Sequence, residues 1–358
     1  MSPEAGRTSE HATDRRLAAD LVIHGASEVL TCVPSRGSAM DRIPAGSVAV
    51  GARRILAVGS RREVAEAVSL EGAEVVEAAG GVVAPGFVDA HTHLVFGGSR
   101  VQEYAARLTR SRGQVQALGI PTGIMATVEM TRLEDADALC ASAAGRLDEM
   151  LAHGTTTAES KSGYGLDVPS ELKLLQVNRR LNDSHHIDIV STFMGAHDFP
   201  PQVPREAYVD QVIDEMIPRV AEDQLAGFCD VFCDEGYYTV EQARRILEAG
   251  RKAGLAPKIH ADQYSDLGGA DLAADLGAVS ADHLNFTAAG SLRRLASAGV
   301  VGVLMPLIDF AVRHPRPIRA REWADAGLEI ALGTDLCPGG YSVSMPLAIQ
   351  FACRWNGL

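Results

Sequence analysis

The feature that most constrains the fold of this 358-residue chain is an alternation of short apolar runs with helical stretches after Gly81. Helical patterns such as 135–152, 170–181 and 240–253 separate most of the runs, and the last begins with a Thr239–Gln242 capping-box pattern. The sequence therefore predicts an α/β fold, a TIM (β/α)8 barrel, with an open doubly wound sheet as the main alternative. The eight expected strands are residues 82–91, 155–160, 187–195, 228–232, 257–260, 278–281, 300–305 and 328–333.

Ionisable side chains occur where seven of these eight strands end; the seventh strand, which ends at Met305, lacks one. Catalytic groups of (β/α)8 barrels lie at the carboxyl ends of the strands, so the pattern predicts an active site at that face. In chain order the residues are Asp89, His91 and His93; Lys161; His197 and Asp198; Asp234 and Glu235; His260 and Asp262; Asp282 and His283; and Asp335.

His91 and His93 are the first pair expected to bind a metal ion. In an extended segment, residues two apart point to the same face, so both imidazoles can reach one ion. An isolated His-x-His pair is common in surface loops, but here His260, His283 and Asp335 occupy equivalent strand-end positions. Imidazole and carboxylate ligands together suit Zn²⁺, Fe²⁺ or Mn²⁺, with Zn²⁺ the default.

Several assignments stay open from the residues alone. Asp335 is either a metal ligand or the N-cap of the next helix, and His283 is a fourth imidazole near the ion, a proton carrier or a structural histidine. Glu235 could bridge a second ion, but Lys161, on the second strand, looks badly placed for that task. We therefore expect one divalent metal.

Charge and composition exclude some partners. Asp and Glu outnumber Lys and Arg by 46 to 33, a net charge of −13, which argues against nucleic acid because phosphate binding needs a basic face. An anionic substrate would need a local cation, and Arg100, seven residues after His93, can supply a bidentate fork. Tyr164 lies between Gly163 and Gly165, which allow the backbone to approach a ligand closely.

The chain has no apolar run of the roughly 18 residues that a membrane span needs. Six scattered Cys and the lack of a leader pattern predict a reduced, cytoplasmic enzyme. We expect residues 1–18 to form a disordered tail and residues 19–80 a small β-rich lobe, because short β-like runs occur at 21–23, 47–50, 54–58 and 74–76. Residues 81–358 are expected to form the metal-dependent barrel.

Six segments resemble the amidohydrolase superfamily and, within it, the imidazolonepropionase family. The likeness spans roughly residues 20–353, and the matching segments are 85–100, which contains His-Thr-His and Arg100, 155–166, 195–197, 258–263, 268–283 and 333–340. The resemblance implies that the metal ligands are His91, His93, His260 and Asp335. It implies a substrate site formed by Arg100, Tyr164, His197, Gln263, Gly339 and Gly340, and a catalytic set of His283, Asp335 and Gln263.

The family opens the ring of 4-imidazolone-5-propanoate to N-formimino-L-glutamate during histidine degradation. The resemblance therefore implies a hydrolase that acts on a cyclic amide C–N bond, holds one Zn²⁺ or Fe²⁺, takes a small anionic ring substrate and forms a homodimer. Arg100 would bind the propionate of that substrate, and Asp335 or His283 would relay a proton to the leaving nitrogen.

The chain departs from the family pattern in three places. A Gly-Gly-Gly-Ile run, preceded by a ligand-facing Tyr, is replaced by residues 121–124, Pro-Thr-Gly-Ile, and no Tyr lies between Tyr104 and Tyr164. Cys337 stands where the family has Asn after the metal-binding Asp. The family also continues past the eighth strand to complete the small lobe, so the barrel is expected to be truncated at its C-terminus.

These departures keep two alternatives open. One is a related amidohydrolase that acts on another carboxylate-bearing five-membered ring, such as a hydantoin or a thio-analogue, or that deaminates a ring. The other is a non-catalytic or truncated remnant.

Overall fold

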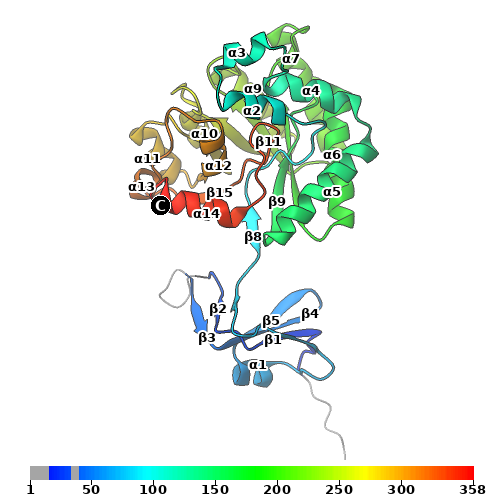
Figure 1. The fold of residues 1–358 in the computed structure, drawn as a ribbon, viewed down its shortest axis with the longest axis vertical. Coiled ribbons are helices and arrows are strands. Elements are labelled where there is room, and N and C mark those ends of the chain that lie inside the picture. Colours follow the sequence, from blue (N-terminus) through cyan, green and yellow to red (C-terminus); the bar gives the residue numbers. More distant parts are fainter. Residues whose placement is uncertain (1–15, 34–39) are drawn as a thin grey trace, which may run out of the picture. The chain divides into compact units, whose positions relative to one another are not determined.

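The computed structural model describes residues 16–33 and 40–358 (Figure 1), so most of the expected tail, residues 1–15, lies outside the described residues. The chain divides into two compact units, Met1–Pro85 and Gly86–Leu358. Each unit has its own apolar core: Val22, Ala49 and Val64 are buried in the small unit, whereas the core of the large unit lies between its strands and helices. Each is described below by itself.

The small unit is rich in β-structure. One sheet has the order β5-β4-β1-β6 and the other the order β3-β2-β7. The helix α1 (Arg61–Ala67) is capped by Ser60 in a capping box with Glu63. The strands are β1 (Leu21–His24), β2 (Glu28–Leu30), β3 (Arg42–Pro44), β4 (Gly46–Gly51), β5 (Arg54–Ser60), β6 (Glu74–Glu77) and β7 (Val82–Val83).

The large unit contains one eight-stranded parallel sheet in which every strand pairs with its neighbours in chain order. The first and last strands are joined through the segments that follow them: the Ala90 amide donates to the Leu332 carbonyl (3.2 Å), and the His93 amide to the Leu336 carbonyl (2.8 Å). The sheet thus closes almost completely into a barrel. Its strands are β8 (Phe87–Asp89), β9 (Thr155–Lys161), β10 (Asp188–Ala196), β11 (Phe228–Cys233), β12 (Ala256–Ala261), β13 (Ser280–His283), β14 (Val301–Leu304) and β15 (Ile330–Leu332).

Helices surround this sheet (Figure 1). The three helices expected from the sequence are present as α5 (Ala136–Ala152), α6 (Val168–Ser184) and α9 (Val240–Lys252), and Thr239 and Gln242 form the predicted capping box. The others are α2 (Val101–Arg107), α3 (Arg112–Ala117), α4 (Gly123–Leu133), α7 (Arg205–Gln211), η1 (Val212–Met216), α8 (Ile217–Glu222), α10 (Gly269–Leu276), α11 (Ala289–Ser297), α12 (Pro306–Ala311), α13 (Ala320–Asp325) and α14 (Met345–Arg354).

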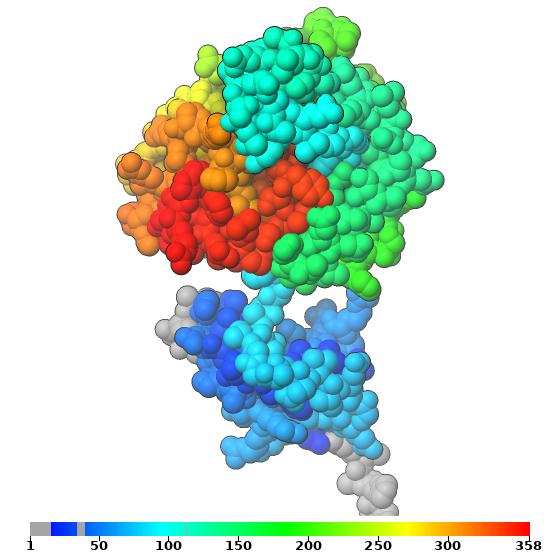
Figure 2. Space-filling view, in the orientation of Figure 1, coloured from blue at the N-terminus to red at the C-terminus, as the bar shows by residue number. Residues whose placement is uncertain are grey.

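The first expected strand, residues 82–91, is longer than the strands that the structure contains there. Residues 82–91 form two short strands, β7 in the small unit and β8 in the barrel, because Pro85 lacks an amide hydrogen and Gly86 follows it. His91 and His93 therefore lie beyond the strand rather than in it. In the large unit the segment that contains α2–α4, coloured cyan, lies beside the C-terminal segment in red (Figure 2). Both segments contribute walls to the pocket described next.

Candidate active site

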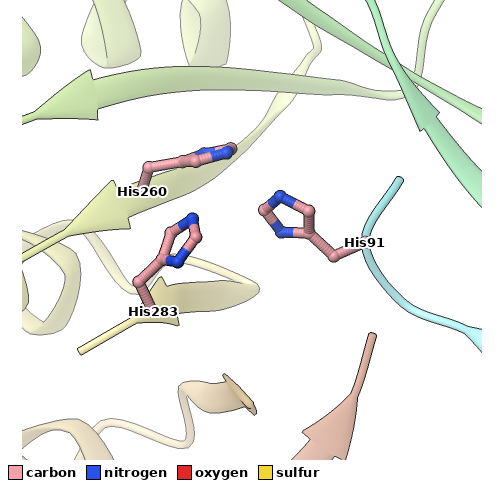
Figure 3. A group of neighbouring side chains, drawn as sticks. All are labelled: His91, His260 and His283. Carbon is pink, nitrogen blue, oxygen red and sulfur yellow. The ribbon is translucent and has the colours of Figure 1, made fainter. Parts of the chain in front are cut away.

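Four imidazoles and one carboxylate converge at the carboxyl ends of the barrel strands. His91 and His93 follow β8, His260 lies in β12, His283 ends β13, and Asp335 follows β15. None of the five is more than 5% exposed. The rings of His91, His260 and His283 face one another (Figure 3), with centroids 4.5 Å apart for His91–His260 and 5.1 Å for His260–His283.

The donor atoms of this group fit a metal ion. One nitrogen each from His91, His260 and His283 lie within 4.8 Å of one another, as do donor atoms of His91, His93 and Asp335. The Nε2 atoms of His91 and His260 are buried and have no hydrogen-bond partner among the described residues. A buried lone pair without a donor is unfavourable, and a divalent cation would satisfy it.

Two buried aspartates lie beside the Nδ1 atoms of His91 and His260. Nδ1 of His91 donates to Oδ2 of Asp282 (2.7 Å), which leaves its Nε2 as the lone-pair nitrogen, the usual arrangement of metal-binding histidines. Nδ1 of His260 lies 3.0 Å from Oδ2 of Asp230 but makes no hydrogen bond to the described residues, so both nitrogens of His260 are without a hydrogen-bond partner there.

Burial favours the neutral form of three of these imidazoles. It lowers the pKa of His91, His93 and His283 well below the ordinary value, and neighbouring positive groups lower it further. Burial also raises the pKa of Asp335 well above its ordinary value, although Lys161 opposes this. Neutral imidazoles are the form that binds metals, and a cation at this position would favour the ionised form of Asp335.

A network of buried charges lies beneath the imidazoles. Nζ of Lys161, which is 0% exposed, lies 2.7 Å from Asp230, 2.9 Å from Glu159 and 3.2 Å from Asp282. Burial alone would lower the pKa of Lys161, but these three carboxylates raise it well above the ordinary value. Nζ of Lys258 lies 2.6 Å from Glu159. Lys161 is therefore an internal counterion of the aspartates that orient the histidines.

The pocket above the candidate metal ligands has a volume of about 550 Å³, which suits a small molecule. Its lining includes the ligands and substrate residues expected from the sequence, with the exceptions of His91, which is buried below, and Gly340, which lines an adjacent cavity of about 460 Å³ that Arg100 and Gly339 share. A Cβ on Gly339 would lie 3.4 Å from Nη1 of Arg100, so the glycine allows close approach to the guanidinium.

Arg100 is held by a residue that the sequence analysis did not single out. Its Nε donates to Oε2 of Glu103 (2.7 Å), one turn along α2, and the Glu103 side chain is only 5% exposed. The other oxygen of Glu103 lies 3.5 Å from Nη1 of Arg107. Glu103 accepts from Nε, and the Nη groups of Arg100, which lines the pocket, make no hydrogen bond among the described residues.

His197 and Tyr164 line the same pocket. The ring of His197 stacks on His93 with centroids 4.7 Å apart, and its Nδ1 donates to the Gly163 carbonyl (3.0 Å). Gly163 has φ of +101°, and a Cβ there would lie 2.9 Å from that same nitrogen, so glycine is required. Burial raises the pKa of Tyr164 well above its ordinary value, so its hydroxyl is a neutral hydrogen-bond group.

Gln263 and Cys337 complete the lining. The Gln263 carbonyl accepts from Nε2 of His314 (2.9 Å), which anchors the loop after β12 to the loop after β14. Burial raises the pKa of the Cys337 thiol to about 12, so it is a neutral, compact group at the wall. Glu235, considered for a second metal, lines the pocket at an exposed position.

Three of the strand-end residues of this site have a strained backbone. Asp262, His283 and Asp335 have positive φ values of 51°, 74° and 50°, an uncommon conformation for residues other than glycine. Asp262 is stabilised by hydrogen bonds from the Gly269 amide and the Thr287 hydroxyl. Such strain is typical of functional positions, where it aims side chains that a regular strand would direct elsewhere.

The structure brings every site residue predicted from the sequence into one region of the large unit. Sequence reasoning missed Asp230, Glu103 and the role of Lys161, which had looked badly placed. A signal existed for Asp230, since it interrupts the apolar run 228–233, where a lone buried carboxylate needs a partner. Nothing in the local sequence marked Glu103, because an acid three residues after an arginine is common on helix surfaces.

Comparison with known proteins identifies close relatives. The chain is 44% identical over 344 residues to the imidazolonepropionase of Halobacterium salinarum (strain R1), covering 95% of this chain and 82% of that protein. It is 47% identical over 284 residues to the imidazolonepropionase of Geobacillus kaustophilus, and 48% over 279 residues to that of Shouchella clausii. The last two alignments cover 78% and 77% of this chain but 66% and 62% of those proteins. No protein-family model matches.

Solved structures share the fold at low sequence identity. Guanine deaminase from C. acetobutylicum, solved with guanine, superimposes with a TM-score of 0.67 at 13% identity, covering 93% of this chain and 78% of that one. An adenosine deaminase from Xanthomonas campestris, solved with zinc, gives 0.61 at 18% identity, with coverage of 95% and 74%. At these identities the likeness concerns the fold alone. No helix in the described part of the chain is long and apolar enough to cross a membrane.

Proposed function

The chain belongs to the imidazolonepropionase family, and we propose that it hydrolyses the ring amide of 4-imidazolone-5-propanoate to N-formimino-L-glutamate in histidine degradation. One observation carries the proposal: a guanidinium with free Nη groups and a set of metal-binding donors line the same pocket of about 550 Å³. A substrate with a carboxylate at one end and an electrophilic ring carbonyl at the other matches both features.

We propose that His91, His93, His260 and Asp335 hold one divalent metal ion, Zn²⁺ or Fe²⁺. When bound, such an ion would polarise the ring carbonyl and acidify a water molecule. An adenosine deaminase that shares this fold was solved with bound zinc, which supports a metal in this chain. The donor set of imidazoles and one carboxylate is compatible with either metal.

The chain's own residues would orient the ring and move the proton. Arg100 would bind the propionate through its two Nη groups, while Tyr164 and His197 hold the ring against the ligands. Gln263 would donate its amide hydrogens to a ring acceptor. Asp335 or His283 would take the proton of the attacking water and deliver it to the ring nitrogen as the C–N bond breaks.

The test uses the ultraviolet absorbance of 4-imidazolone-5-propanoate. Incubation with the metal-loaded protein should abolish this absorbance as the conjugated ring opens, and His260→Ala should not. A metal-loaded, folded protein that leaves the absorbance unchanged would rule the proposal out.

A second candidate is favoured by the altered pocket wall at Cys337 and in the segment 113–124, which ends in the Pro-Thr-Gly-Ile run and contributes Gly123 and Ile124 to the pocket. Cys337 lines the pocket beside Arg100, where a different ring would be accommodated. Hydantoin-5-propanoate and an amino-substituted ring analogue, assayed in parallel, separate this candidate from the first. The expected homodimer, the cytoplasmic location, the lack of nucleic-acid binding and the domain bounds at residues 18 and 80 remain predictions.

A further inference from the structure

The buried network beneath the imidazoles contains more charge than ligand orientation alone requires. Three carboxylates, Glu159, Asp230 and Asp282, are at most 4% exposed, and two ammonium groups, Lys161 and Lys258, balance most of their charge. Buried charges are tolerated only when they are paired closely, and each of the two ammonium groups is paired with at least one of these carboxylates.

Lys161 lies where a second metal ion could otherwise bind. Donor atoms of His91, Glu159 and Asp282 lie within 4.8 Å of one another, as do those of Asp230, His260 and Asp282. The acidic members of both groups are the carboxylates that Nζ of Lys161 contacts at 2.7–3.2 Å. The ammonium therefore occupies the space among these acids that a cation would use.

Lys161 also lies one contact away from two proposed metal ligands. Asp282 accepts from Nδ1 of His91, and Asp230 faces Nδ1 of His260. The oxygen of Asp282 that accepts from His91 and the oxygen of Asp230 that faces His260, Oδ2 in both residues, are the same atoms that Nζ of Lys161 contacts, at 3.2 Å and 2.7 Å. The ammonium thus holds both carboxylates in the orientation in which they face the imidazoles.

We propose that Lys161 is a positioning residue that acts as a built-in cation: it holds Asp230 and Asp282 against the metal-binding histidines and excludes a second divalent metal. The inference rests on the proposed function in so far as His91 and His260 are the metal ligands. It does not depend on which ring is hydrolysed.

Lys258 provides a matched control. It is equally an ammonium on a barrel strand, and it is 7% exposed. Its ion pair is with Glu159 alone among the described residues, and its Nζ lies 5.5 Å from the centre of the Phe228 ring. Loss of Lys258 should remove a buried charge without freeing the space between Asp230 and Asp282.

The first experiment counts bound metal. Parent protein, Lys161→Ala and Lys258→Ala are equilibrated with excess Zn²⁺ or Co²⁺, desalted and assayed for metal by mass spectrometry, with circular dichroism as the check of folding. We expect one equivalent in the parent and in Lys258→Ala, and two in Lys161→Ala. A parent that binds two equivalents, or a folded Lys161→Ala that binds one, would overturn the proposal.

The second experiment tests whether Lys161 positions the metal-binding histidines. It uses a methionine side chain, which fills the space of the lysine so that no second ion can enter. Lys161→Met should bind Co²⁺ at least about tenfold more weakly in chelator competition, and its visible Co²⁺ spectrum should change, because the histidines lose their fixed orientation. Lys258→Met should stay within about threefold. If Lys161 merely repelled the metal, Lys161→Met would bind it more tightly, which contradicts positioning.

These readouts separate the two proposals. If metal counts and affinities follow expectation while 4-imidazolone-5-propanoate is not hydrolysed, the proposed function fails and the role of Lys161 stands. Should Lys161→Ala not fold, the parent stoichiometry and Lys161→Met still decide.

Discussion

The base of the pocket, which contains His91, His260 and Asp335, differs in construction from its mouth, which contains Arg100 and Tyr264. At the base, His91, His260 and Asp335 are at most 5% exposed, lie at or next to barrel strands and are held by buried partners. At the mouth, Arg100 precedes a seven-residue helix, and Tyr264 is 46% exposed. The register of the strands fixes the backbone at the base, so that only side-chain rotamers can vary there. The mouth is formed by loops, whose conformation can change without disturbing the sheet.

This contrast teaches where the two parts of the chemistry reside. Under the proposed function, the reaction type belongs to the base, whose candidate ligands come from strand ends far apart in sequence. Substrate selection would belong to the mouth, where the chain departs from its family, at Cys337 and the 113–124 segment. Substitutions at the base should therefore abolish turnover, and those at the mouth should mainly change substrate affinity.

The largest effect is expected at the base. His260→Ala should lose bound metal and reduce kcat/KM by at least about a thousandfold, because one donor of the metal site is removed. Metal content and steady-state kinetics measure the two losses together, and the exposed His153→Ala serves as the control. An active variant that has lost its metal would show that the base does not carry the chemistry.

At the mouth, Arg100→Ala should raise KM by roughly 10- to 100-fold with kcat within about threefold, since a charge-assisted pair to the substrate is lost. Initial rates across a range of substrate concentrations give the split, and Arg321→Ala, a change at an exposed site, should match the parent. An unchanged KM would mean that Arg100 does not bind the carboxylate.

A smaller effect on KM is expected when Arg100 loses its contact with Glu103. Glu103→Ala should raise KM by about 2- to 10-fold, because Nε of Arg100 loses its acceptor. Glu103→Gln keeps an oxygen acceptor and should stay within about twofold. Equal effects of the two variants would show that the charge of Glu103, not its hydrogen bond, matters.

The smallest effect concerns Asp309 in α12, whose titration should make the stability of the protein depend on pH. Burial raises the pKa of Asp309 to about 7, partly opposed by the hydrogen bond from Asn285 (2.8 Å). The unfolded value is about 3.9, so the folded state favours the protonated acid, and its contribution to stability is lost as pH rises from about 4 through 7.

Asp309→Asn should consequently show a smaller fall in Tm between pH 5 and pH 8 than the parent. Thermal denaturation at both pH values measures the difference, with the exposed Asp325→Asn as the control. Parallel Tm profiles for parent and Asp309→Asn would contradict the assigned titration.

Much of the barrel could be predicted from local pattern. Buried parallel strands read as short apolar runs, and each of the seven expected strands after the first overlaps an observed one. The first was wrong in length because the pattern of Val82–Val83 continues past Pro85 although the chain changes unit there. The strands β2 and β3 were missed because each is only three residues long, too short to show a period.

The candidate site likewise contains residues that local pattern predicted and contacts that it did not predict. Strand-end position marked His91, His260, His283 and Asp335, because the fold itself directs those positions to one face. Strand-end position also marked Asp282, and Asp230 interrupts an apolar run, but nothing local marked their partners: Asp282 meets His91 across 191 residues of chain, and Asp230 meets Lys161 across 69.

The sequence by itself determined the class of fold and the face of the barrel where chemistry would occur, because apolar periodicity and strand-end polarity are local properties. The tertiary structure alone decided which ring nitrogens are free, which acids share the Lys161 ammonium, and how Glu103 aims Arg100. Those relations depend on ångström distances between distant segments, which only the closure of the sheet establishes.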